Sequence, residues 1–210
     1  MRLLIFDLDG TLIDSKRDLA NSANAARGYM GLPPIPDEVV ASYVGNGAPM
    51  LIRRALGPDA TDEQVARALE FFLRHYTEHC LDNTRLYPGV KEALEQFPAR
   101  MAVLTNKPVA ATNRILSALG CADLFFRIYG GNSFDRKKPD PVGIEALLTE
   151  TGEPRESALM IGDSAVDVRT ARNAKIGACG VTYGFQPETF EADPPDFLVD
   201  DLRELTQHML

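Results

Sequence analysis

The sequence has few cysteines and no long apolar run, and each scarcity excludes a class of protein. Cysteine occurs three times in 210 residues, at Cys80, Cys121 and Cys179, and never as a CxxC pair. An odd number of isolated thiols does not build a disulfide framework, so we expect buried free cysteines in a reducing cytoplasm. The apolar residues 3–6 end at Asp7, which is too early for a signal segment, and no stretch is long enough to span a bilayer.

Positive charge is also scarce. The 22 Lys and Arg residues are outnumbered by 30 Asp and Glu residues, and the formal net charge is −8. Binding to nucleic-acid phosphates requires a basic patch, and since there is no long Lys/Arg run we expect no nucleic-acid partner. The composition, 45% hydrophobic and 25% charged, is that of an ordinary globular protein. The length suits one medium core with a small insertion, or two small domains, and a monomer and a homodimer both stay open.

Four short, continuously apolar runs are typical of strands buried on both faces of a parallel sheet. They cover residues 3–6, within an expected strand at residues 2–8, and residues 101–104, 158–161 and 197–199. Helical patterns lie between them, at residues 109–119, 141–151 and 165–174. This alternation of strand and helix predicts an α/β fold, a doubly wound, Rossmann-like core around a parallel sheet.

Residues 15–85 break the alternation, because they contain helical patterns and no strand pattern. The expected helices cover residues 18–30, 37–43, 49–56 and 62–80. Thr61, followed by Gln64, resembles a capping box at the start of the last of these helices. We therefore expect a helical cap domain at residues 15–85, inserted into a core formed by residues 1–14 and 86–210.

Polar clusters follow the expected strands, and ligands of open parallel sheets bind beyond the carboxyl ends of the strands. The clusters are Asp7-Leu8-Asp9-Gly10-Thr11, Thr105-Asn106, Lys137-Lys138-Pro139, and Gly162-Asp163-Ser164 with Asp167. Although they are far apart in the sequence, this topology brings them to one edge of the sheet.

The chemistry of these clusters points to a metal and a phosphoryl group. Three acidic side chains would repel one another at close range: Asp7, Asp9 and Asp163. A divalent cation removes this repulsion, and a set of oxygen ligands suits Mg²⁺. With Lys138 beside the metal, the edge becomes a cationic site for a phosphoryl group, whose oxygens could accept hydrogen bonds from Thr105 and Asn106.

Residues 7–12, Asp-Leu-Asp-Gly-Thr-Leu, resemble the DxDGT signature of the haloacid dehalogenase-like hydrolase superfamily. Thr105, Lys138 and Gly162-Asp163-Ser164 with Asp167 fit the three other motifs of that superfamily, in order and at ordinary spacing. The resemblance covers essentially the whole chain, including a helical cap inserted after the first strand. It implies a Mg²⁺-dependent hydrolase that acts on a small-molecule phosphate ester.

The resemblance also implies catalytic roles. Asp7 would be the nucleophile that forms an aspartyl-phosphate, and Asp9 would protonate the leaving alkoxide and then activate water. Lys138 would neutralise charge on the nucleophile and the phosphoryl group, and Gly10 would permit the tight turn that places Asp9. In the dehalogenases the position of Asp9 is not an acid, because a halide leaves without a proton. Asp9 therefore favours phosphate esters.

The resemblance implies a metal site as well. Mg²⁺ would be held by the carboxylates of Asp7 and Asp163 and by the backbone carbonyl of Asp9. Asp167 would support that set of ligands, although an acid at this position is also favoured by the dipole of the helix that it begins. Lys137 is interpreted as an exposed neighbour of Lys138.

The expected cap indicates a substrate. Val44-Gly45-Asn46-Gly47, which leads into the helix at residues 49–56, resembles the phosphoglycolate phosphatase branch of the superfamily. Asp14-Ser15 and Tyr87-Pro88-Gly89-Val90, on either side of the cap, resemble that branch too. Gly45 and Gly47 would let a cap loop close on a small substrate. Sugar-phosphate mutases of similar build place a basic residue where this chain has Ala48.

Two further groups in the cap are candidates for binding. A substrate carboxylate needs a cation, and Arg53 and Arg54 beside the apolar stripe of their helix are candidates, with ordinary surface positions as the alternative. His75 and His79, followed by Cys80, have the spacing of a transition-metal site on one helix face. No partner ligand is evident, so we interpret them as part of an ordinary helix face.

The function predicted from the sequence is hydrolysis of 2-phosphoglycolate to glycolate and phosphate. A broad-specificity sugar-phosphate, nucleotide or pyrophosphate phosphatase with the same catalytic residues is the alternative. A phosphate-binding protein without turnover, and a haloacid dehalogenase, are more distant alternatives.

Overall fold

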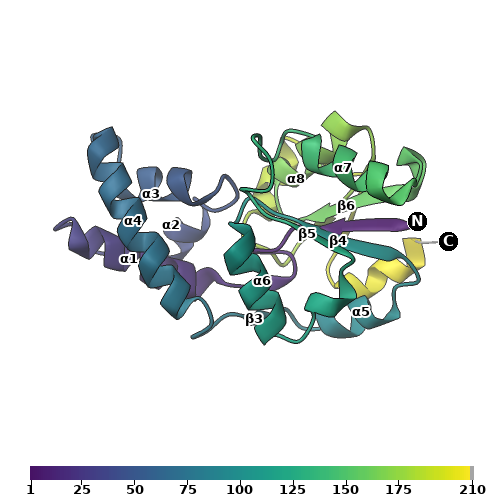
Figure 1. Cartoon of the computed structure of the whole chain (residues 1–210), viewed down its shortest axis with the longest axis horizontal. Coiled ribbons are helices and arrows are strands. Elements are labelled where there is room, and N and C mark those ends of the chain that lie inside the picture. Colours follow the sequence, from purple (N-terminus) through teal and green to yellow (C-terminus); the bar gives the residue numbers. More distant parts are fainter. Residues whose placement is uncertain (209–210) are drawn as a thin grey trace.

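A computed structural model describes residues 1–208 and shows an α/β core with a helical cap at one end (Figure 1). Six parallel strands form the core sheet in the order β5-β4-β1-β6-β7-β8. Their bounds are β1 Leu3–Phe6, β4 Arg100–Leu104, β5 Arg127–Tyr129, β6 Ala158–Gly162, β7 Gly177–Val181 and β8 Phe197–Val199. The predicted doubly wound α/β fold is confirmed.

Helices cover both faces of the sheet, which explains why its central strand is continuously apolar. Leu4 and Phe6 of β1 pack in one core cluster, and Leu3 and Ile5 pack in the other. The first cluster includes residues of α5 and α6, and the second includes residues of α7 and α8, on the opposite face (Figure 1). These helices are α5 Val90–Gln96, α6 Val109–Ala118, α7 Val142–Thr151 and α8 Ala165–Ala174.

Short 3-10 helices complete the core. They are η1 Ala122–Leu124, η2 Arg155–Ser157, η3 Pro187–Glu191 and η4 Leu202–His208. Leu202 and Leu205 of η4 are fully buried in the same cluster as α5, so this last segment closes one face of the sheet.

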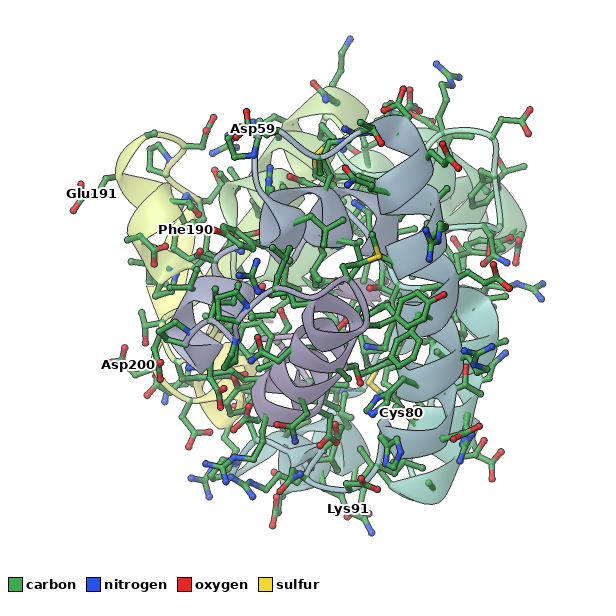
Figure 2. The ribbon with its side chains drawn as sticks, turned by 90° about the vertical axis from the view of Figure 1, so that its left-hand side faces the viewer. Asp59, Cys80, Lys91, Phe190, Glu191 and Asp200 are labelled. Atoms are coloured by element: carbon green, nitrogen blue, oxygen red, sulfur yellow. The ribbon has the colours of Figure 1, made fainter. Side chains whose placement is uncertain are left out.

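The cap consists of four helices whose apolar faces pack on one another. They are α1 Lys16–Tyr29, α2 Asp37–Ala41, α3 Ala48–Leu56 and α4 Asp62–His79. Figure 2, which views the molecule from the cap end, shows α1 and α4 lying in front of the core. The predicted capping box is confirmed at the start of α4: Gln64 N donates to Thr61 Oγ1 at 3.2 Å, and Thr61 N donates to Gln64 Oε1 at 2.9 Å.

The two segments that join cap and core run side by side. Ile13–Asp14 (β2) and Arg85–Leu86 (β3) form an antiparallel pair, so the prediction that residues 15–85 contain no strand is wrong at Arg85. Next to this pair the buried carboxylate of Asp18 accepts hydrogen bonds from Thr84 N and Thr84 Oγ1, both at 2.8 Å. Although burial opposes its ionisation, hydrogen bonds from Asn83 and Thr84 hold the pKa of Asp18 below its usual value.

Candidate active site

The carboxyl ends of three neighbouring strands meet at the edge of the sheet that faces the cap (Figure 1). Asp7 follows β1, Thr105 follows β4 and Asp163 follows β6. In the register of the sheet, Phe6 of β1 is opposite Val103 of β4 and Ile161 of β6. The strand order therefore brings the predicted clusters together at one edge, as ligand sites of open parallel sheets require.

Three buried carboxylates lie close together at this edge. Single oxygen atoms of Asp7, Asp163 and Asp167 lie within 4.8 Å of one another. Burial first, and then Asp167, raises the pKa of Asp7 to about 6, although Lys138 acts in the opposite direction. Burial, Asp167 and Asp7 raise the pKa of Asp163 well above its usual value. Each acid is therefore harder to ionise because of the others, which is the condition that a bound cation relieves.

Lys138 is the counter-charge that the protein itself supplies to these acids. Its Nζ lies 2.6 Å from Asp167 Oδ1 and 2.8 Å from Asp7 Oδ1. Burial opposes the charge of the ammonium group, but Asp167 and Asp7 raise the pKa of Lys138 above its usual value, so it stays protonated. The contact with Asp7 Oδ1 lacks hydrogen-bond geometry, and that oxygen has no hydrogen-bond partner among residues 1–208. Such an unsatisfied buried oxygen fits a metal ligand.

Asp167 has two partners, one for each of its oxygens. Oδ2 accepts from Ser164 N at 3.3 Å and Ser164 Oγ at 2.9 Å at the start of α8, while Oδ1 faces Lys138. The two interpretations offered by the sequence are therefore compatible, because the carboxylate caps its helix and also belongs to the acidic cluster.

Gly10 is required by the packing of this site. Its φ is +86°, and a Cβ atom at this position would lie 2.1 Å from Asp163 Oδ2. Any larger residue would strain the backbone and displace the carboxylate. Gly10 therefore acts through the absence of a side chain.

Asp9 turns its carboxylate away from the acidic cluster. Ser15 Oγ donates to Asp9 Oδ1 at 2.5 Å, and Lys107 Nζ lies 2.9 Å from Oδ1 and 3.1 Å from Oδ2. The side chain of Asp9 is thus not grouped with those of Asp7, Asp163 and Asp167, which leaves its backbone carbonyl for the predicted metal role.

Lys107 is a residue of this site that the sequence analysis missed. Besides Asp9, its Nζ donates to the hydroxyl of Tyr76, in α4 of the cap, at 2.6 Å. Burial opposes its charge, but Asp9 and Tyr76 raise the pKa of Lys107 above its usual value. The signal that could have revealed it is its position two residues after Thr105, at the end of a buried strand.

Thr105 and Asn106 differ in whether a side-chain hydrogen remains to be donated to a ligand. The Thr105 hydroxyl accepts from Lys107 N at 3.3 Å, and its own hydrogen is available to a ligand. The Asn106 amide donates to Gly45 O at 2.8 Å and to Lys138 O at 3.0 Å, so it has no hydrogen left for a phosphoryl oxygen. The prediction that Asn106 binds a phosphoryl oxygen stays a prediction, and it cannot rest on these two side-chain hydrogens. Asn106 joins the cap loop to the backbone of Lys138.

The loop between α2 and α3 contacts the core mainly through its backbone. Gly45 and Gly47 have φ values of +101° and +84°, and the Gly45 carbonyl accepts from Asn106. On its other side, Gln186 Nε2 donates to Ala41 O at 3.1 Å and Val44 O at 2.9 Å. The two glycines thus lie where the loop meets the core.

A cavity of about 140 Å³ lies between the acidic edge and the cap. Asp7, Asp9 and Thr105 line it from the core, together with Lys107. Tyr76 and apolar residues of the cap line the facing side. The site is therefore a small enclosed space with the acids at one wall.

The other predicted cap groups lie outside this cavity. The exposed Arg53 pairs with Asp62 at 2.5 Å, and the exposed Arg54 donates to Asn46 Oδ1 at 2.8 Å. Neither arginine is among the residues that line the cavity.

The remaining predictions concern side chains away from the site. His75 Nδ1 lies 3.0 Å from Ser22 Oγ, and His79 Nδ1 lies 2.8 Å from Asp82. Within residues 1–208 the acidic cluster is the one group of His, Cys, Asp or Glu side chains placed to hold a metal ion. The three cysteines are free and buried, as predicted. No helix in the described part of the chain combines the length and apolar character needed to cross a membrane.

Comparison with known proteins agrees with this geometry. The curated relatives include proteins named phosphoglycolate phosphatase from Vibrio vulnificus YJ016 and Mannheimia succiniciproducens. The first is 40% identical over 220 residues, with 100% of this chain and 96% of the relative covered. The second is 39% identical over 215 residues, covering 97% and 96% respectively.

A solved structure gives the same result for the fold. A crystal structure described as that of a predicted phosphoglycolate phosphatase from Haemophilus somnus 129PT matches with a TM-score of 0.94 and 33% identity, over 100% of this chain and 98% of that one. The family model for haloacid dehalogenase-like hydrolases matches residues 4–181, a range that contains all of the predicted site residues. The chain belongs to the haloacid dehalogenase-like hydrolase family.

Proposed function

We propose that the protein is a Mg²⁺-dependent phosphatase that hydrolyses 2-phosphoglycolate through an aspartyl-phosphate on Asp7. The observation that carries this proposal is the placement of Asp7 between Lys138 and two further buried acids, at the wall of a small cavity that Asp9 also lines. A nucleophile and a proton donor thus face one space, and the ammonium group of Lys138 lies against the nucleophile, which is what phosphoryl transfer to a carboxylate requires.

The carboxylates fit a divalent metal. Asp7, Asp163 and Asp167 supply oxygen ligands, which Mg²⁺ prefers, and Oδ1 of Asp7, 2.8 Å from Lys138 Nζ, accepts no hydrogen bond of good geometry. When bound, Mg²⁺ would supply positive charge next to the transferred phosphoryl group and the attacking carboxylate. Lys138, whose Nζ is 2.8 Å from Asp7 Oδ1, adds to this charge.

In the first step, a carboxylate oxygen of Asp7 attacks phosphorus and the bond between phosphorus and the ester oxygen breaks. Asp9 gives a proton to that oxygen, so the leaving group departs as an alcohol. Thr105 donates its free hydroxyl hydrogen to a phosphoryl oxygen, and Lys138 keeps the nucleophile and the phosphoryl charge balanced.

In the second step, water attacks the phosphorus of the aspartyl-phosphate. Asp9, now deprotonated, takes a proton from this water, and the bond between phosphorus and Asp7 breaks. Inorganic phosphate leaves, and both aspartates return to their starting states. One residue thus serves as acid and then as base, as the order of the two steps requires.

Replacement of Asp7 by Asn tests whether there is turnover at all. The wild type is assayed with an aryl phosphate and Mg²⁺, and Asp7→Asn is assayed beside it. Absence of turnover in the wild type would favour a phosphate-binding protein, whereas undiminished turnover in the variant would exclude Asp7 as nucleophile. Release of halide from a haloacid without metal would instead support a dehalogenase.

The size of the cavity and the names of the relatives support a small substrate. A space of about 140 Å³ is below the roughly 300–1,000 Å³ typical of pockets for larger ligands, which argues against a nucleotide. A panel of phosphate esters ranked by kcat/KM tests this choice. A preference for 2-phosphoglycolate below about tenfold, ~1.4 kcal/mol, would favour the broad-specificity alternative.

A further inference from the structure

Lys107 is a buried cation that the two steps above do not use. It is 7% exposed, and its Nζ is held by Asp9 on the core side and by the Tyr76 hydroxyl on the cap side. Burial of an ammonium group is unfavourable unless it has partners, so the position of Lys107 calls for a reason beyond stability. It also contacts the cap and the core at the same time.

The charge of Lys107 faces the cavity. Among the described residues that line this space, Lys107 is the one Lys or Arg, and Asp7 and Asp9 are the acids. Its ammonium group donates to the Tyr76 hydroxyl and to both oxygens of Asp9, at 2.9 Å and 3.1 Å, so a ligand carboxylate would take over the longer of the two contacts with Asp9. The hydroxyl of Tyr76 accepts from Lys107 and keeps its own hydrogen for donation.

The proposed reaction places a substrate carboxylate next to Lys107 and Tyr76. The ester oxygen that leaves must approach Asp9, because Asp9 protonates it. In 2-phosphoglycolate a single methylene group separates this oxygen from the carboxyl carbon. A carboxylate so close to Asp9 therefore lies beside Lys107 Nζ, which is 2.9 Å from Asp9 Oδ1.

The two arginines proposed from the sequence do not compete for this role. Arg53 pairs with Asp62 and Arg54 pairs with Asn46, and both side chains are exposed. Neither lines the cavity, so a carboxylate bound at Asp9 meets Lys107 and not these guanidinium groups.

We propose that Lys107 Nζ and the Tyr76 hydroxyl bind the carboxylate of a small 2-phosphorylated hydroxy acid and so set the substrate specificity of this site. This inference rests on the proposed function. Lys107 comes from the core and Tyr76 from the cap, so the carboxylate would be bound across the boundary between the two. The substrate would then be recognised by its acid group next to the reacting ester.

A matched pair of esters tests the proposal. 2-Hydroxyethyl phosphate has a hydroxymethyl group where 2-phosphoglycolate has its carboxylate, so the ratio of the two kcat/KM values isolates recognition of the acid. In Lys107→Met we expect this ratio to fall at least about tenfold, because the variant keeps the length of the side chain and loses its charge. In Tyr76→Phe we expect a smaller fall, of about threefold, since one hydrogen bond is lost.

Arg54→Met is the matched control, because it removes one cation from the cap without reaching the cavity. Its ratio should stay within about twofold of the wild type. A fall in Arg54→Met with an unchanged ratio in Lys107→Met would overturn the proposal in favour of the arginine. Equal losses for both esters in Lys107→Met would also overturn it, because Lys107 would then only position Asp9.

A binding measurement covers the case in which Lys107→Met has no measurable turnover. In the Asp7→Asn background, calorimetry with 2-phosphoglycolate and Mg²⁺ should show at least about tenfold weaker binding after Lys107→Met, and equal binding would contradict the inference. If the wild type hydrolyses both esters equally and Asp7→Asn abolishes both activities, this inference fails and the phosphatase stands. If the wild type hydrolyses no phosphate ester, the proposed function fails first.

Discussion

The acidic edge of the core and the facing side of the cap hold their polar groups in different ways. At the edge, side chains from separate segments contact one another directly, as Lys138 does with Asp7 and Asp167. On the cap side, the loop of residues 42–47 is held mostly through backbone carbonyls, by Asn106 and Gln186. A substitution at the edge changes charges that all depend on one another, whereas one in the loop leaves these backbone contacts in place.

This difference suggests that chemistry and specificity are carried by different parts of the molecule. The acids at the edge are buried close together at a cost in stability, which is typical of catalytic sites. The cap side contributes shape and a few polar contacts. Four measurements test this division, and they are ordered from the largest expected effect to the smallest.

Asp7→Asn should lower kcat for any phosphate ester by about 10⁴-fold or more, because the amide is a poor nucleophile. The same variant should be more stable than the wild type in EDTA at pH 7.5, by about 1 kcal/mol or more, since one of three repelling carboxylates is gone. Urea unfolding measures the stability, and Asp7→Ala controls for loss of packing. A less stable Asp7→Asn protein would contradict the idea that the site is costly.

Without metal, stability should fall as the pH rises from about 4 to about 6. Over this range the unfolded Asp7 loses its proton while the folded one, with a pKa raised to about 6 chiefly by burial, keeps it. The unfolded state thus binds fewer protons. Above the folded pKa of Asp7, the free energy of unfolding has fallen by about 3 kcal/mol in total.

Mg²⁺ binds the ionised carboxylates, so its stabilising effect should grow over the same pH range. Thermal unfolding in Mg²⁺ and in EDTA at pH 5 and pH 7.5 measures this difference, and Asp7→Asn should reduce it. An increment from Mg²⁺ that is the same at both pH values would show that these acids are not the metal ligands.

Gly10→Ala should destabilise the protein by about 1–3 kcal/mol, because it strains a positive φ and brings a Cβ against Asp163. Since Asp163 would be displaced, the Mg²⁺ concentration for half-maximal activity should rise as well. Gly28→Ala, in a cap helix with open space around the position, is the control and should be neutral or slightly stabilising. Unchanged metal dependence in Gly10→Ala would separate the turn from the metal site.

Gln186→Ala should have the smallest effect. It removes two hydrogen bonds to the cap, each with a net contribution of about 0.5–1.5 kcal/mol, and because only part of this loss reaches the bound substrate, KM should rise about three- to tenfold. The value of kcat should stay within about twofold, because Asp7, Asp9 and Lys138 are untouched. A fall in kcat with constant KM would mean that the loop also positions the reacting groups.

The sequence predicted those parts of the fold that depend on local patterns. The helix at Ala165–Ala174 and the strand at Phe197–Val199 have the predicted bounds, because strong periodicity and continuous apolar runs identify them. The strands Arg127–Tyr129 and Gly177–Val181 were missed. The first is three residues long and begins with an exposed arginine, and the second contains two glycines, so neither has a clear apolar pattern.

For the site, the motifs predicted which residues meet but not how each side chain is used. Asp7 and Asp163 come together because strand order determines their positions, whereas Lys138 reaches them from the loop between β5 and α7. Lys107 and Asn106 depend on contacts with the cap, through Tyr76 and Gly45, and these contacts arise only from the packing of distant segments. No local sequence pattern encodes such partners, so the roles of Lys107 and Asn106 could be recognised only in the structure.

The hydrogen bonds that the Asp18 carboxylate accepts from Asn83 and Thr84 have a consequence for engineering the protein. Because this carboxylate ties the first cap helix to Asn83 and Thr84, the segments by which the chain enters and leaves the cap are bonded to each other. The polypeptide chain thus enters and leaves the cap through one pair of neighbouring segments, β2 and β3. A cap taken from a relative with its own Asp–Asn–Thr hydrogen bonds could be grafted at β2 and β3, and would bring a new substrate preference to an unchanged set of catalytic acids.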